Sequence, residues 1–237
     1  MCHQKSTVYG CRCISVSTHS LNPGCTGAQG WFLTVYGHPH LSCTPRVAAT
    51  LHEKQVPFKL VVVDLLGKEQ KSPAYLEKQP FGQIPVLEDD GYRIYETRAI
   101  CRYIAEKYAG QGTTLIPTDL KAKGIFEQAA SVEYANWGAL CEQGGYRESL
   151  QGMLVSLEAN LDVYDKILAK QKWVAGDEFT LADLFHMPYA ALLPRVGRDV
   201  IAARPNVARW AKELLARPSW QAVKDGVQVY CLNCHGS

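Results

Sequence analysis

This sequence lacks a strong net charge, a long apolar run and, before Glu53, any acidic residue. Its 25 Lys and Arg nearly balance its 23 Asp and Glu, and a net charge of +2 leaves no electrostatic footprint for nucleic acid. No apolar run approaches the roughly 18 residues that a membrane span requires, so we expect no membrane partner. With 47% hydrophobic and 20% charged residues, the 237-residue chain has the composition of a globular protein, not a disordered one.

The first 31 residues also lack the continuous apolar core of a secretory signal. They are rich in Ser and Thr and contain only Lys5 and Arg12 as basic residues of the Lys and Arg type. An acid-free, serine-rich start is a feature of mitochondrial transit peptides, but two basic residues without an amphipathic period favour a disordered extension. We therefore expect residues 1–31 to be an extension that precedes the folded part.

The nine cysteines indicate no disulfide framework, because nine is an odd number and the chain is long enough to build a core. Reduced thiols point to a cytoplasmic protein. Cys231-Leu232-Asn233-Cys234-His235 matches the C-x-x-C-H haem attachment motif, but with so little chain after it we interpret the match as chance. Cys231 and Cys234 lack the second ligand pair that a zinc site needs, so we expect no metal.

The segment after the extension alternates short apolar runs with helical spacing. The runs at 32–36 and 59–63 predict strands, and Pro45 predicts the first turn of a helix between them. Because the second run is apolar throughout, we expect a strand buried on both faces in a parallel βαβ unit. A short helix, a hairpin turning at Asp-Asp-Gly and a further helix are predicted at 72–78, 84–95 and 96–108.

The second half shows helical patterns only. A linker is expected at 110–117, and Thr180 and Asp183 have the spacing of a capping box at a helix start. Apolar residues spaced four and three apart predict one long amphipathic helix: Leu150, Leu154, Leu157, Leu161, Tyr164 and Leu168. Val207 and Trp210 predict a further helix after Pro205. We therefore expect an all-helical domain over 118–226 and a tail over 227–237.

Two motifs carry the functional interpretation. Gln79-Pro80-Phe81-Gly82-Gln83-Ile84-Pro85 is followed by Glu96-Thr97-Arg98-Ala99-Ile100. On these motifs the chain resembles a glutathione S-transferase, closest to the phi-like group of plants and fungi and to its fungal members. The resemblance runs from about Phe32 to Asp225. It implies the glutathione transferase fold, with a thioredoxin-like α/β domain over 32–111 and the all-α domain after it.

The same resemblance implies the chemistry. Glutathione is expected as a co-substrate, with no bound cofactor, and its thiol attacks a hydrophobic electrophile in detoxification or natural-product tailoring. A homodimer is also implied. Two readings remain open beside the transferase: a non-catalytic glutathione-binding or scaffold protein of the same fold, and a Cys-dependent glutathione oxidoreductase.

The resemblance also assigns the binding residues. It implies a cis Ile84–Pro85 bond, which lets Ile84 pair with the cysteinyl backbone of glutathione. Glu96 and Thr97, at a helix N-terminus, hold the γ-glutamyl end. It also implies that Lys71 and Gln70 hold the glycyl carboxylate at the other end, and that Gln83 lies between the two ends.

The residue that activates the thiol is less plainly marked. The family's catalytic serine falls on Leu41, which cannot donate a hydrogen bond, and Ser42 one position later is the first candidate. Cys43 is the alternative, and with it the chemistry becomes thiol–disulfide exchange on glutathione. Tyr36 at the end of the first strand is a minor candidate, and two loop histidines that could flank the second substrate are His38 and His40.

The helical half departs from the family between Trp137 and Leu161, where the sequence is shorter than usual. Four glycines are expected to interrupt a helical hairpin there: Gly138, Gly144, Gly145 and Gly152. In the family this hairpin forms part of the electrophile pocket and of the dimer face, so both are expected to differ here.

Overall fold

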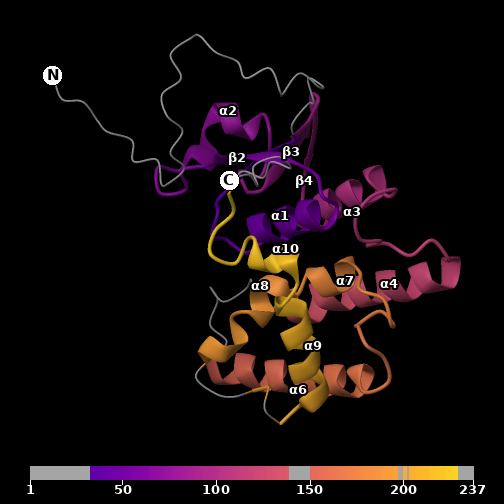
Figure 1. The fold of residues 1–237 in the computed structure, drawn as a ribbon. Coiled ribbons are helices and arrows are strands. Elements are labelled where there is room, and N and C mark those ends of the chain that lie inside the picture. Colours follow the sequence, from indigo (N-terminus) through magenta and orange to yellow (C-terminus); the bar gives the residue numbers. More distant parts are fainter. Residues whose placement is uncertain (1–32, 139–149, 197–199, 202, 229–237) are drawn as a thin grey trace, which may run out of the picture. The chain divides into compact units, whose positions relative to one another are not determined.

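The computed structural model describes residues 33–138, 150–196, 200–201 and 203–228 (Figure 1). The expected extension at 1–31, the Cys231–His235 motif, Gly144 and Gly145 lie outside these residues. In the part of the chain that is described, no helix combines the length and the apolarity that crossing a bilayer takes.

A four-stranded mixed sheet forms the first half, with the strand order β2-β1-β3-β4. β1 and β2 are parallel, whereas β3 is antiparallel to both β1 and β4. The strands are β1 (Leu33–Gly37), β2 (Phe58–Val62), β3 (Val86–Asp89) and β4 (Tyr92–Tyr95). The helices are α1 (Cys43–Glu53), η2 (Glu69–Lys71, a 3₁₀ turn), α2 (Pro73–Leu76) and α3 (Thr97–Lys107). This is the expected βαβαββα order of a thioredoxin-like domain.

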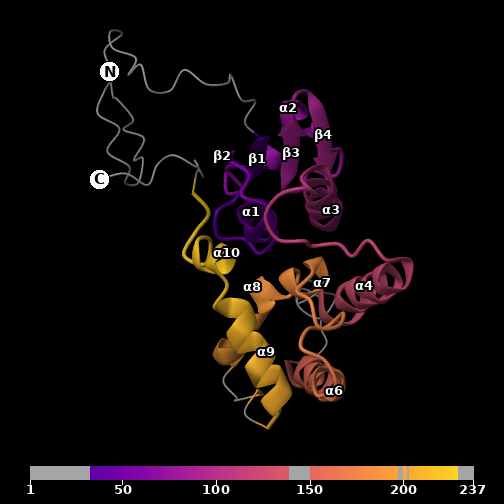
Figure 2. The same ribbon diagram turned by 45° about the vertical axis from the view of Figure 1, so that its right-hand side comes forward.

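Helices cover both faces of the sheet (Figures 1 and 2). α1 and α3 pack on one face, where Val47, Leu51 and Ile100 belong to the main core. α2 covers the other face through Tyr75, which is buried with Val63 in a smaller cluster.

One strand prediction is wrong. The apolar run at 59–63 was expected to be buried on both faces, but β2 is an edge strand with one neighbour, β1. Val62 is 57% exposed and Lys59 is exposed, while Phe58 at the start of the strand is fully buried. An apolar run does not distinguish an edge strand from a central one, because sheet order depends on which strands pair across the fold.

The hairpin prediction is confirmed. Asp90 and Gly91 connect β3 to β4 with φ values of 49° and 81°. A two-residue turn with positive φ at both positions matches the right-handed twist of the flanking strands, which is why Asp-Gly is favoured there. The turn fixes the register that pairs Val86 with Tyr95.

The second half is helical, as expected. Its elements are α4 (Leu120–Val132), η3 (Glu133–Gly138, a π-helical segment), α6 (Leu150–Leu168), α7 (Leu181–Leu184), α8 (Met187–Ala190), η4 (Leu193–Val196), α9 (Pro205–Leu215) and α10 (Pro218–Gln221). Thr180 and Asp183 form the predicted capping box at α7. Gly152 was expected to interrupt a helix, but α6 runs through it without a break.

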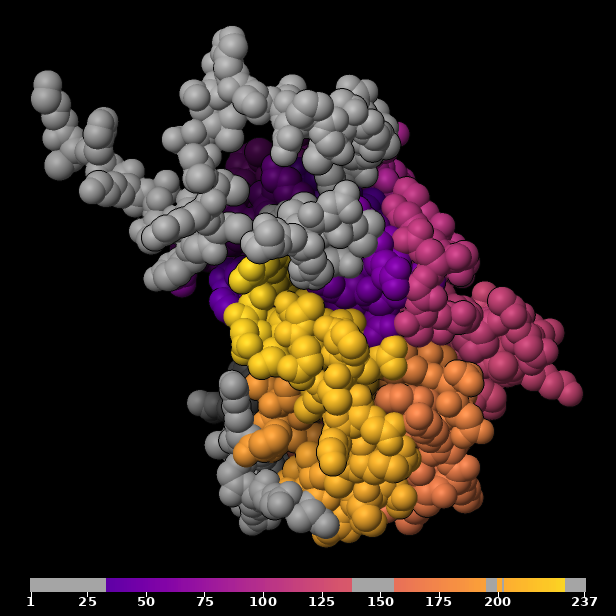
Figure 3. Space-filling model, viewed as in Figure 1, coloured from indigo at the N-terminus to yellow at the C-terminus, as the bar shows by residue number. Residues whose placement is uncertain are grey.

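The two halves are joined by buried polar contacts as well as by a shared apolar core. Glu53 at the end of α1 accepts hydrogen bonds from Arg217 Nε and Nη2, at 2.6 and 2.7 Å, and from Ser219 Oγ at 2.6 Å. Burial raises the pKa of Glu53, but these hydrogen bonds outweigh it and hold the pKa below its usual value. In Figure 3 the yellow C-terminal helices abut the indigo surface of the first helix.

Candidate functional site

A cavity of about 540 Å³ lies beside the loop that leads into β3. Six of the expected glutathione-binding residues line it: Gln70, Gln83, Ile84, Pro85, Glu96 and Thr97. Its wall also includes Cys43 of α1, Gln79, Arg98 of α3 and, from the helical half, Tyr134 of η3. Motifs that are separate in the sequence thus meet around one space.

Two expected site residues, Lys71 and Ser42, are not among the lining residues. Lys71 Nζ donates to the carbonyl oxygen of Phe81 at 2.8 Å, so it braces the turn before Gln83. Ser42 is the N-cap of α1 and its side chain makes no capping hydrogen bond. Its hydroxyl lies 4.0 Å from Cys43 Sγ instead.

The loop before β3 is fixed by a cis peptide bond and by a hydrogen bond from α2. The Ile84–Pro85 bond is cis, as the resemblance implied. Tyr75 Oη donates to the carbonyl oxygen of Gln83 at 3.0 Å. Burial raises the pKa of Tyr75 to about 12, so the phenol keeps its proton and remains a donor. Because β3 begins only at Val86, Ile84 lies outside the sheet ladder, at the cavity wall.

Glu96 has an unusual backbone. Its φ and ψ are 71° and 111°, outside the regions that non-glycine residues favour. Such a conformation costs about 1–3 kcal/mol and tends to persist at functional sites. It places Glu96 at the N-cap of α3, directly before the buried Thr97. A helix N-terminus favours an anionic group, and the adjacent carboxylate favours a cationic one.

The catalytic candidates in and around the loop before α1 differ in whether they line the cavity. Leu41 is 44% exposed, Cys43 is half-buried, and of the candidates in this loop only Cys43 lines the cavity. Tyr36 lies in β1 with Lys78 Nζ 4.7 Å from its ring centroid. His38 and His40 lie outside the cavity wall, and His40 instead packs near Gly226 in the C-terminal segment.

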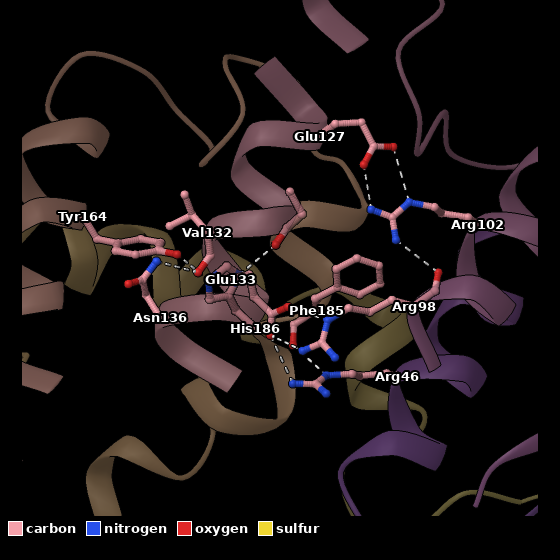
Figure 4. A network of polar contacts seen from close by, with 11 residues as sticks. Arg46, Arg98, Arg102, Glu127, Val132, Glu133, Asn136, Tyr164, Phe185 and His186 are labelled. Carbon is pink, nitrogen blue, oxygen red and sulfur yellow. Dashed lines mark hydrogen bonds and ion pairs between the residues drawn. The ribbon is translucent and has the colours of Figure 1, made fainter. Parts of the chain in front are cut away.

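A buried ionic cluster behind the cavity was missed by sequence reasoning. Glu133, fully buried, accepts from Arg98 Nε and Nη2 at 2.8 and 2.9 Å and from Arg46 Nη2 at 3.4 Å. Arg46, also fully buried, donates to the carbonyl oxygen of Phe185 at 2.7 Å. Figure 4 shows the arginines converging on the carboxylate. Nothing in the local sequence marks Glu133, because its partners come from α1 and α3.

This cluster is charged in the folded protein. Burial raises the pKa of Glu133, but the hydrogen bond from Arg98 and the positive charges of Arg46 and Arg98 outweigh it and keep the pKa below its usual value. Arg98 lies in the cavity wall and also 4.9 Å from the ring centroid of Tyr134. The carboxylate of Glu133 therefore fixes one wall of the cavity.

Gln79 is a further cavity residue to which the sequence analysis assigned no role. It is 2% exposed, lines the cavity, and its Oε1 is buried with no hydrogen-bond partner among the described residues. A buried polar atom without a partner costs about 1–3 kcal/mol. A ligand that brings a donor into the cavity would remove that cost.

Comparison with known proteins gives the same family in both halves. Residues 32–106 match the family model of the glutathione S-transferase N-terminal domain, and residues 146–218 match that of the C-terminal domain. A glutathione S-transferase of Arabidopsis thaliana is 45% identical over 193 residues, 74% of this chain and 88% of the relative. One from Hypomyces subiculosus is 43% identical over 194 residues, 75% and 91% of the two chains. The solved structure of maize glutathione S-transferase I with an atrazine–glutathione conjugate has a TM-score of 0.72, 29% identity, and coverage of 81% and 96%.

Proposed function

This chain belongs to the glutathione S-transferase family, and from that premise we propose how its cavity binds glutathione and directs the thiol. The activity is transfer of glutathione to an electrophilic small molecule. One observation carries the binding mode: residues from two sequence motifs converge on a single cavity whose wall includes the strained Glu96.

Each part of glutathione is matched by different residues of the cavity wall. The γ-glutamyl carboxylate lies at the N-terminus of α3 beside Thr97, and its ammonium faces the Glu96 carboxylate. The cysteinyl backbone pairs with Ile84, which lies outside the ladder of β3. Gln70 and Gln83 hold the remainder, and Lys71 supports them by bracing the Phe81 turn.

The thiol must be made nucleophilic. A free thiol has a pKa of about 8.5, and lowering it by about two units takes roughly 2.7 kcal/mol. A hydrogen bond to the charged sulfur contributes about 1.5–3 kcal/mol and a helix N-terminus about 0.3–1. We propose that Ser42 supplies this hydrogen bond: Ser42 does not itself line the cavity, but its hydroxyl makes no capping bond to α1 and lies 4.0 Å from Sγ of Cys43, which does line it.

The electrophile enters from the side of the helical half. Tyr134, from η3, lines the same cavity and is 62% exposed, so its ring is available to an apolar acceptor. Detoxification and natural-product tailoring both fit such an acceptor. We also propose a homodimer: Phe81, on the turn that Lys71 braces, is 65% exposed, and a symmetric interface would bury it.

The experiment begins with binding and proceeds to turnover. Protein retained on immobilised glutathione is assayed with a chloro-nitroaromatic acceptor. We expect turnover, and in Glu96→Gln a KM for glutathione raised about 10- to 150-fold, because the ammonium loses a charged partner worth about 1.5–3 kcal/mol. The matched control is Glu106→Gln on α3, whose carboxylate is exposed and outside the cavity. Binding without turnover would favour the scaffold reading, and equal KM values in the two variants would remove Glu96 from the site.

A further inference from the structure

The position of Cys43 points to a second chemistry in the same cavity. Cys43 is the first residue of α1, it is half-buried, and it lines the space that holds Ile84 and Glu96. Ser42, its neighbour, does not line that space. A glutathione whose cysteinyl backbone lies at Ile84 therefore has its sulfur in the cavity that Cys43 faces.

We propose that Cys43 forms a mixed disulfide with glutathione and that the protein thereby transfers glutathionyl groups between thiols. The proposal rests on glutathione binding in this cavity, as proposed above. The substrates are glutathione disulfides: oxidised glutathione, or a mixed disulfide of glutathione with another thiol.

The surroundings of Cys43 suit this reaction. Cys43 begins α1, and the Ser42 hydroxyl is 4.0 Å from Cys43 Sγ, within reach of a weak hydrogen bond. The cavity also carries an independent mark of a ligand site, the buried Oε1 of Gln79, which has no partner among the described residues.

Cys101 shows what an inert cysteine looks like in this fold. It is fully buried in α3, and its thiol donates to the carbonyl oxygen of Arg46 at 3.8 Å. Burial raises the pKa of its thiol to about 11. Cys101 is outside the cavity, so it provides a matched control for Cys43.

The steps balance without a further oxidant. The Cys43 thiolate attacks the glutathionyl sulfur of a mixed disulfide; the new S–S bond forms as the old one breaks, and the other thiol leaves as a thiolate that takes up a proton from water. A reduced glutathione thiolate then attacks the sulfur bound to Cys43. This second exchange releases oxidised glutathione and restores the Cys43 thiolate.

The test uses the full chain, reduced and then treated with oxidised glutathione. Peptide mapping by mass spectrometry locates any glutathionyl group, and transfer is assayed with a mixed disulfide of glutathione and 2-mercaptoethanol. We expect the modification on Cys43. The transfer rate of Cys43→Ser should be reduced at least about 100-fold, because a hydroxyl does not replace a thiolate in disulfide exchange. Cys101→Ala should keep both the modification and the rate.

Failure of the Cys43 proposal and failure of glutathione binding give different results in this experiment. Protein that binds reduced glutathione by calorimetry but leaves Cys43 unmodified, or transfers equally well as Cys43→Ser, overturns the inference and leaves the binding site intact. Protein that binds no glutathione overturns both. Retention of Cys43→Ser on immobilised glutathione shows that a lost transfer rate is not a lost fold.

Discussion

Glu133 and Glu127 form a natural pair for measuring what the buried cluster contributes. Each carboxylate pairs with an arginine of α3: Glu133 with Arg98, and Glu127 with Arg102 at 2.8 Å (Figure 4). The side chain of Glu133 is 0% exposed, whereas that of Glu127 is 44% exposed. The same substitution, Glu to Gln, therefore removes a similar ion pair from two very different environments.

We expect Glu133→Gln to lower the free energy of unfolding by about 3–5 kcal/mol, because it leaves the fully buried Arg46 and the partly buried Arg98 without the carboxylate between them. Glu127→Gln should cost about 0.2–1 kcal/mol, the value of an exposed pair. Against a total stability of about 5–15 kcal/mol, the first change is large.

Urea unfolding followed by tryptophan fluorescence measures both variants. With a slope of about 2–3 kcal/mol per molar, Glu133→Gln should shift the midpoint by about 1–2 M. The fluorescence reports on this region, because Trp137, 1% exposed, lies in the π-helical segment that Glu133 begins. Equal midpoint shifts in the two variants would refute the reasoning, since burial would then not decide the value of the pair.

Two further predictions concern stability. Gly112→Ala should destabilise by about 2 kcal/mol or more, because φ is +61° and the new Cβ would overlap the Glu53 carbonyl oxygen; Gly124→Ala, in α4 with open space around it, should stabilise by about 1 kcal/mol. Denaturant unfolding compares the two. Burial lowers the pKa of His186 from 6.5 to about 4, so the unfolded chain gains the proton first as pH falls. The contribution of neutral His186 to stability should drop by about 2 kcal/mol between pH 7 and pH 5, and His186→Gln should lack this drop; parallel pH profiles of the two proteins would contradict it.

The secondary structure was predicted well where its causes are local. The Asp90-Gly91 turn and the Thr180–Asp183 capping box each depend on residues next to one another, and both are confirmed. The edge position of β2 was not predictable in this way, because the pairing of strands depends on contacts between distant segments.

In the candidate site, too, the features with local causes were predictable and those that depend on distant contacts were not. The motifs containing Ile84 and Glu96 can be recognised in the sequence, because each is a short run of adjacent residues that lines part of the cavity. The sequence does not show whether Ser42 or Cys43 lines the cavity, because the two residues are adjacent at the start of α1 and differ in which one faces the cavity. That orientation is set by how α1 packs on the sheet.

The sequence by itself determined the family and the order of the elements, because each is encoded within a turn, a cap or a motif of a few residues, and it predicted the residues proposed to bind glutathione. Only the tertiary structure decided that Glu133 joins Arg98 across 35 positions and Arg46 across 87, and that Tyr134 and Gln79 share a cavity with Cys43. Burial and charge pairing are properties of segments brought together by folding, and no local pattern records them.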